Sequence, residues 1–180
     1  MSYRPICDVW ILARSKVKYY GAYPAGFLHR ARALLGVGLD DPVLHVCAGR
    51  VRDYPYRGIG VNDKTLDLDP TCRPDFLRDA RYPLSDLWPG DSTRMWSAVL
   101  IDRPYTPDDA ARYAPGADKL PEINALLRNA LNVVPVGGRV GILDYVWPMP
   151  PKSAIEVAVV AVGTGRNNRA RWFTVFERLS

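Results

Sequence analysis

The sequence has few of the residues that build metal centres or disulfide frameworks. It contains three cysteines and two histidines among 180 residues, and Cys7, Cys47 and Cys72 are far apart. An odd, unclustered set argues against a disulfide scaffold, structural zinc and an iron–sulfur cluster. With only His29 and His45 in the chain, the sequence also disfavours a histidine-built metal site. We therefore expect a protein without a metal.

Other functional signatures are missing as well. No apolar run is long enough to span a membrane, and residues 1–5 lack the apolar core of a signal peptide, so we expect a cytosolic protein without a membrane partner. No Gly-x-x-x-x-Gly-Lys-Ser/Thr stretch is present to bind a nucleoside triphosphate. The absence of a Pro-Cys dipeptide argues against cytosine C5 methylation through a cysteine nucleophile.

The composition is that of an ordinary globular protein. With 48% apolar and 24% charged residues, the chain is expected to form a single domain over residues 1–180 with a substantial core. Residues 1–38 are expected to form an N-terminal segment and a helix that pack on a sheet. The formal net charge is +5, which fits either contact with a phosphate backbone or a solvated basic surface. Basic residues gather near both ends, at Arg14, Lys16, Lys18, Arg166, Arg169 and Arg171.

Apolar periodicity predicts strands and helices that alternate along the chain. Helices are expected from Pro24 to Gly36 and over residues 120–134, and a loop over residues 106–120. Only about 15 residues separate the first two strands, which barely accommodates a crossover helix. Seven strands are expected, over residues 43–46, 65–68, 75–80, 95–101, 139–145, 155–162 and 172–176. The last two read as a hairpin, so the pattern predicts a mostly parallel sheet with one antiparallel strand.

The tetrapeptide Asp102-Arg103-Pro104-Tyr105 directly follows the apolar run 98–101. It places a carboxylate, a rigid turn and an aromatic ring at the carboxyl end of a buried strand. Open α/β sheets bind their ligands at that end. A carboxylate and a flat ring there are suited to hold a planar substrate that carries an amine.

The order of elements resembles the Rossmann-like class I S-adenosylmethionine-dependent methyltransferases, a three-layer sandwich whose seven-stranded sheet ends in such a hairpin. The resemblance covers residues from about 18 to about 179. With the tyrosine-rich segment 19–26, the chain is similar to small methyltransferase-like proteins of phage and bacterial genomes. The tetrapeptide resembles the Asp-Pro-Pro-Tyr motif of enzymes that methylate adenine N6 or cytosine N4, with Arg103 in place of the first proline.

The resemblance implies methyl transfer from S-adenosylmethionine to an exocyclic amine of a nucleic-acid base, with DNA as the expected substrate. Such an amine is a poor nucleophile because its lone pair is conjugated into the ring. Asp102 and the carbonyl of Arg103 would accept hydrogen bonds from the amine, and Tyr105 would stack on a base flipped out of its helix. Pro104 biases Arg103 toward extended geometry. The Arg103 side chain would contact a phosphate, or pair with Asp102 and disable it.

The resemblance also implies a set of cofactor contacts. Gly49 would let backbone N–H groups approach the methionine carboxylate, although Val51 stands where the family has a second glycine. Asp67 would accept from both ribose hydroxyls; Asp69 is the alternative and otherwise a turn residue or cap. Asp79 would accept from the adenine amine, or it is a salt-bridged surface residue. The implied cofactor residues are Tyr20, Tyr23, Pro24, Ala48, Gly49, Asp67, Leu68, Asp79, Ala80 and Asp102.

The chain leaves no room for the target-recognition region that sequence-specific DNA methyltransferases carry. Specificity is then loose, or the target is a single strand, or a protein partner supplies recognition. Two other functions stay open: methylation of a free nucleotide or another small amine, and binding by a degenerate member that has lost catalysis. Both Val51 and Arg103 favour the degenerate member. The methyltransferase reading requires Gly49, Asp67 and Asp102 to meet around one pocket.

Overall fold

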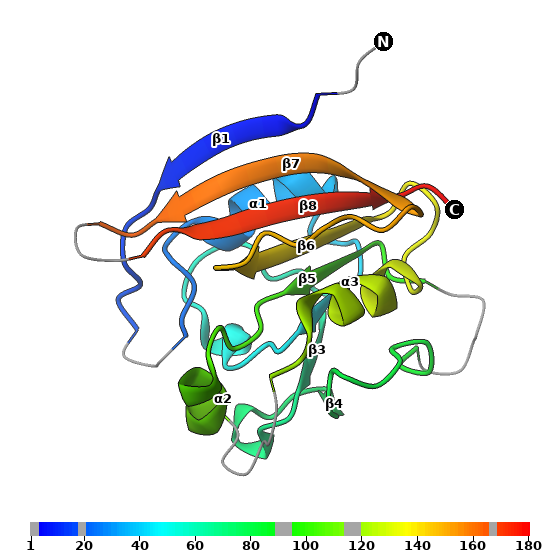
Figure 1. Ribbon diagram of the computed structural model, residues 1–180. Coiled ribbons are helices and arrows are strands. Elements are labelled where there is room, and N and C mark those ends of the chain that lie inside the picture. The colour runs from blue at the N-terminus through cyan, green and yellow to red at the C-terminus, as the bar shows by residue number, and fades with distance from the viewer. Residues whose placement is uncertain (1–3, 18–20, 89–94, 114–119, 166–168) are drawn as a thin grey trace.

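The computed structural model describes residues 4–17, 21–88, 95–113, 120–165 and 169–180 (Figure 1). Its eight strands are β1 (Ile6–Ile11), β2 (Val43–Val46), β3 (Lys64–Asp67), β4 (Phe76–Leu77), β5 (Ala98–Ile101), β6 (Arg139–Asp144), β7 (Ala154–Gly163) and β8 (Arg171–Arg178). Its helices are α1 (Phe27–Leu35), α2 (Pro107–Tyr113) and α3 (Ile123–Leu131), with short 3-10 turns η1 (Val51–Asp53) and η2 (Pro70–Cys72). Within these described ranges, no helix is both long enough and apolar enough to cross a membrane.

All eight strands form one sheet in the order β1-β7-β8-β6-β5-β2-β3-β4. Neighbouring strands are parallel, except that β8 runs antiparallel to both β6 and β7. The mostly parallel sheet with a C-terminal antiparallel hairpin is as predicted. From β2 the chain adds β3 and β4 on one side and then β5 on the other. This reversal of direction opens a crevice at the carboxyl ends of β2 and β5.

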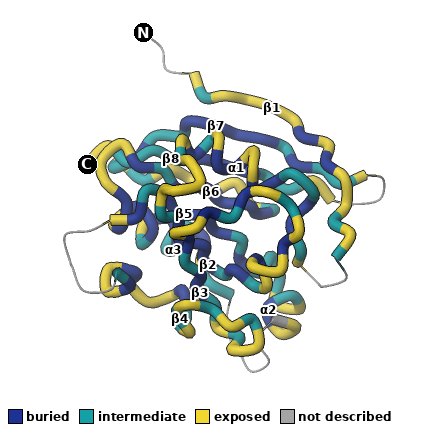
Figure 2. The backbone as a smooth tube through the Cα atoms, turned by 180° about the vertical axis from the view of Figure 1, so that it is seen from behind, coloured by how far each residue is buried: buried dark blue, intermediate teal, exposed yellow. Residues whose placement is uncertain are grey.

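The sequence predicts seven strands, and β1 is an eighth that it does not predict. It pairs in parallel with β7, from Ile6 opposite Ala158 to Ile11 opposite Gly163. Trp10 is the single residue of β1 that is buried, and Figure 2 shows the rest of the strand along an exposed edge. An isolated apolar segment of this kind carries little sign of a strand because its partner lies near the other end of the chain.

The segment 106–120, predicted as a loop, instead begins with helix α2. Thr106 and Asp109 form a reciprocal cap: the Asp109 N–H donates to the Thr106 hydroxyl at 3.1 Å, and the Thr106 N–H donates to the Asp109 carboxylate at 3.2 Å. Pro107 then suits the first helical position. The connection between β2 and β3 contains only η1 in place of a crossover helix, and β4 is two residues long where six were predicted.

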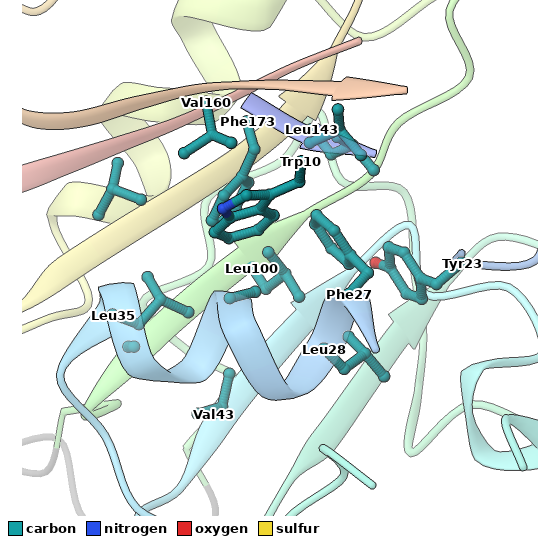
Figure 3. Close-up of a cluster of buried hydrophobic side chains, with 14 of the residues drawn as sticks. Trp10, Tyr23, Phe27, Leu28, Leu35, Val43, Leu100, Leu143, Val160 and Phe173 are labelled. Carbon is teal, nitrogen blue, oxygen red and sulfur yellow. The ribbon is translucent and has the colours of Figure 1, made fainter. Parts of the chain in front are cut away.

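Alternate residues of the central strands face two separate cores. Ala98 and Leu100 of β5 pack with α1, whereas Val99 and Ile101 pack with α3, so the two helices cover opposite faces of the sheet (Figure 1). Aromatic rings dominate the α1 side, where Trp10, Tyr23, Phe27 and Phe173 lie together (Figure 3). The ring centroid of Trp10 lies 6.3 Å from that of Phe27 and 5.9 Å from that of Phe173. The layers thus hold the carboxyl ends of the central strands in fixed positions.

Candidate cofactor and substrate site

A cavity of about 610 Å³ lies at the carboxyl ends of β2, β3 and β5, a volume typical of ligand pockets. Gly49 follows β2, Asp67 ends β3 and Asp102 follows β5, and all three line this cavity. The reversal of strand order between β2 and β5 is what brings these strand ends together. The three residues therefore share one space, which the methyltransferase reading requires.

Most of the predicted site residues reach the same cavity. Pro24 does not line it: its carbonyl accepts the hydroxyl proton of Tyr54 at 2.7 Å. Tyr23 lines it mainly as part of the core, because its ring stacks on Phe27 at 5.0 Å. Lys18, Tyr20 and Arg166 lie outside the described residues. Those that line the cavity are Tyr23, Ala48, Gly49, Asp67, Leu68, Asp79, Ala80, Asp102, Arg103, Pro104 and Tyr105.

Asp67 and Asp69 have different roles in the loop after β3. One Asp67 oxygen accepts the N–H of Gly49 at 2.7 Å, and the other accepts the N–H of Asp69 at 2.9 Å. Since a carboxylate offers about four acceptor sites, Asp67 keeps capacity for a ligand. Asp69 instead accepts the N–H of Thr71 at 2.8 Å and caps η2. The geometry makes Asp67 the cavity residue and Asp69 the turn residue.

The loop after β2 has an unusual backbone. Cys47 and Gly49 both have positive φ angles, of 55° and 51°, and a Cβ added to Gly49 would meet no atom within 4 Å. Space is therefore open in front of the Gly49 backbone. Burial raises the pKa of the Cys47 thiol far above its usual value, so that residue stays protonated. Val51 lies in the core, and its N–H donates to the carbonyl of Ala48 at 3.2 Å.

Asp79 combines both roles that the sequence left open. It lines the cavity, and it also accepts from Arg81 twice, from the backbone N–H and from Nε, each at 2.9 Å. Burial alone would raise the pKa of Asp79, but these hydrogen bonds lower it below its usual value. Asp79 is thus a charged residue at the wall of the cavity.

Asp102 and Tyr105 are joined within the tetrapeptide. The Tyr105 hydroxyl lies 2.5 Å from an Asp102 oxygen, and Arg171 Nη1 lies 3.2 Å from the Tyr105 hydroxyl. Burial raises the pKa of Asp102 to about 6, although the charge of Arg171 and the hydrogen bond from Tyr105 both lower it. At neutral pH the carboxylate is therefore ionised and able to accept hydrogen bonds.

The Arg103 side chain was expected to contact a phosphate or to pair with Asp102, and in the structure it does neither. Its Nε lies 2.7 Å from an oxygen of Asp144, the last residue of β6, and both side chains are buried. Arg103 therefore neutralises Asp144 in place of Asp102 or a phosphate. The buried guanidinium thus ties the turn after β5 to the end of the neighbouring strand β6.

The sequence did not identify Tyr145 as a site residue. The residue directly follows β6 and lines the cavity, with its ring centroid 4.6 Å from that of Tyr105. The signal was available, because β6 was predicted and its carboxyl end lies beside that of β5. Arg169 and Arg171, expected either to contact a phosphate backbone or to form a solvated basic surface, line the cavity, and Arg169 lies 5.9 Å from the Tyr145 ring centroid.

Comparisons with solved structures show which fold this is. TrmN from Thermus thermophilus is similar over 92% of this chain and 52% of its own, with a TM-score of 0.64 and 17% identity. The fold is that of the class I methyltransferases. The rRNA methyltransferase aviRa from Streptomyces viridochromogenes has a TM-score of 0.54 at 14% identity, over 91% of this chain and 88% of its own. SMU.1697c from Streptococcus mutans, solved in complex with SAH, has a TM-score of 0.54 at 11% identity, over 84% and 97%.

The similarity to these solved structures is found by comparing folds, and comparisons of the sequence do not find it. No family model matches the sequence, and no curated protein sequence matches it significantly. The chain spans about half the length of TrmN. Against the seven strands of the expected fold, β1 is an addition at the edge of the sheet next to β7.

Proposed function

We propose that the protein is an S-adenosylmethionine-dependent methyltransferase that acts on an exocyclic amine of a nucleic-acid base. The observation that carries the proposal is that Gly49, Asp67 and Asp102 line one cavity at the strand reversal of a class I methyltransferase fold. The SAH bound in SMU.1697c supports the cofactor class, because SAH is what remains after S-adenosylmethionine loses its methyl group.

The residues around the first half of the cavity fit this cofactor. Asp67 retains acceptor sites for a ribose diol. The space beside the Gly49 backbone is open to a ligand, while the Gly49 N–H itself already donates to Asp67. Asp79 and Ala80 also line the cavity, and the adenine would lie beside them. When bound, S-adenosylmethionine supplies a methyl group on a sulfonium. The chain itself would bind, orient and screen the two reactants from water.

The second half of the cavity fits a base that carries an amine. Asp102 and the carbonyl of Arg103 would accept hydrogen bonds from the amine and direct its lone pair at the methyl group. The Arg103–Asp144 pair holds this turn in place. Tyr105 and Tyr145 provide aromatic surface beside Asp102. Removing either N–H acceptor would leave the lone pair of the amine more conjugated and slow the transfer.

The base could be carried by DNA or by RNA. The tetrapeptide resembles that of DNA-modifying enzymes, while one of the structures with this fold is an rRNA methyltransferase. Arg169 and Arg171 line the cavity, where they would attract a phosphate backbone of either kind.

Titration calorimetry with S-adenosylmethionine, followed by transfer of labelled methyl to DNA, RNA and free nucleotides, tests the proposal. We expect binding of the cofactor, and incorporation that Asp102→Ala reduces by a factor of about 100 or more, the usual effect of losing a positioned polar group. Absence of cofactor binding would overturn the enzymatic reading. Equal incorporation by both proteins would remove Asp102 from the mechanism, and incorporation into nucleotides alone would exclude the polymer substrate.

A further inference from the structure

A hydrogen-bonded chain crosses the substrate half of the cavity from β8 to the end of β5. Arg171 Nη1 lies 3.2 Å from the Tyr105 hydroxyl, which lies 2.5 Å from Oδ1 of Asp102. A guanidinium has donors and no acceptor. The Tyr105 hydroxyl must therefore accept from Arg171, and its single proton points at Asp102. Arg171 therefore sets the donor-to-acceptor direction of both hydrogen bonds.

We propose, building on the function proposed above, that Tyr105 and Arg171 are positioning residues: Arg171 orients the Tyr105 hydroxyl, which holds Oδ1 of Asp102 and leaves Oδ2 for the target amine. The terminal torsion of an aspartate is broad and two-fold, so an unanchored carboxylate rotates readily. Anchoring one oxygen fixes the direction of the other. Preorganisation of this kind raises the rate of a reaction that depends on alignment.

The surroundings of Tyr105 fit a fixed phenol. Its ring packs against Tyr145 at a centroid distance of 4.6 Å and an interplanar angle of 49°, and Arg169 lies over the Tyr145 ring at 5.9 Å. These contacts restrain the ring while the hydroxyl donates its hydrogen bond to Asp102. The role differs from the stacking on a flipped base that the tetrapeptide predicts, and the two roles depend on different atoms of Tyr105.

The charges around Asp102 give the chain a measurable consequence. Burial raises the pKa of Asp102 to about 6, Arg171 and the Tyr105 hydroxyl lower it, and the charge of Asp144 raises it. Loss of either donor would therefore raise that pKa and move the acidic limb of the methyl-transfer profile to higher pH. Ionisable groups from several elements surround this carboxylate. They include Cys47 after β2, Arg103 and Tyr105 after β5, Asp144 and Tyr145 at the end of β6, and Arg169 and Arg171 beside β8.

Tyr105→Phe separates the two roles, because it keeps the ring and removes the hydroxyl. We expect kcat for methyl transfer to fall about 10- to 100-fold with little change in KM, the effect of misalignment rather than weaker binding. Arg171→Met should act in the same direction, and Arg171→Lys, which keeps a donor, should recover part of the loss. Tyr82→Phe, an exposed tyrosine outside the cavity, is the matched control. Full activity in Tyr105→Phe would leave stacking as the role of Tyr105 and overturn the proposal.

A carbon-13 NMR titration of the Asp102 carboxyl, assigned with Asp102→Asn, provides a readout that needs no substrate. It should show a midpoint near pH 6 that moves upward in Tyr105→Phe and Arg171→Met and stays in place in Tyr82→Phe. Shifted midpoints without methyl transfer to any substrate would refute the proposed function, while the hydrogen bonds from Arg171 through Tyr105 to Asp102 would still be supported. Methyl transfer with unshifted midpoints would refute the positioning role alone.

Discussion

Two aspartates that stand two positions apart differ completely in their contacts. Asp67 reaches into the cavity and accepts the N–H of Gly49, whereas Asp69 turns to the N–H of Thr71 and starts η2. The end of the strand explains the difference, because residues two positions apart would point to the same face if the strand continued. Asp67 is the last residue of β3 and still follows its register, while Asp69 already belongs to the turn. One carboxylate is placed to bind a ligand and the other stabilises a loop.

At this scale we predict that Asp67→Asn weakens S-adenosylmethionine binding by about 10- to 100-fold. A hydrogen bond to a charged acceptor contributes about 1.5–3 kcal/mol, and the amide has one acceptor oxygen in place of two. Calorimetry measures the change. Asp69→Asn is the matched control and should bind the cofactor within about twofold of the native protein. A larger loss in Asp69→Asn than in Asp67→Asn would contradict the assignment.

At the scale of the elements, strand β1 has a single buried side chain, that of Trp10. Trp10 packs against both Phe27 and Phe173 (Figure 3), and its indole N–H donates to Asp8 at 2.8 Å. Val9, by contrast, is 64% exposed. The tryptophan therefore fastens an exposed edge strand to the core on the α1 side.

We predict that Trp10→Ala lowers the free energy of unfolding by about 3–5 kcal/mol, the usual cost of removing a large buried aromatic side chain. Val9→Ala, in the same strand, should change it by less than about 0.5 kcal/mol because that side chain is solvent-exposed. Urea denaturation followed by circular dichroism measures both values. Equal effects of the two substitutions would show that β1 is held by its backbone pairing with β7 alone.

Across the whole molecule, a buried carboxylate ties helix α1 to the sheet. Asp63 pairs with Arg32 of α1 at 2.8 Å and contacts His45 of β2 at 3.0 Å, and it accepts the N–H of Gly60 at 2.7 Å. Burial alone would raise the pKa of Asp63, but the hydrogen bonds from His45, Gly60 and Arg32 lower it below its usual value. This network, outside the cavity, accounts for His45 as a structural residue.

We predict that Asp63→Asn lowers the free energy of unfolding at pH 7 by about 3–5 kcal/mol, because Arg32 would be left buried without its partner charge. A carboxylate whose pKa is lowered by folding stabilises the protein above its unfolded pKa, and that stabilisation is lost as the pH falls through the folded value. The difference between the two proteins should therefore be constant above about pH 5 and shrink below about pH 4. Denaturant unfolding across this range measures it; a difference that grows toward acid would contradict this sign.

The sequence by itself determined the central strands, the closing hairpin and the position of the tetrapeptide 102–105. These features depend on local patterns: apolar runs form buried strands, and residues that follow such strands meet at one edge of a parallel sheet. The same rule, applied to β6, would have found Tyr145. A local signal was also present for α2, in the Thr106–Asp109 cap, although the glycine and proline content of the segment favoured a loop.

Only the tertiary structure decided which distant side chains became partners. Three contacts join segments that are far apart in the sequence: the parallel pairing of β1 with β7, the burial of Arg103 against Asp144, and the contact of Arg171 with Tyr105. Charge and spacing within a segment permit several partners for each of these groups. The order of strands in the sheet selects one, because it alone determines which side chains lie within hydrogen-bond distance.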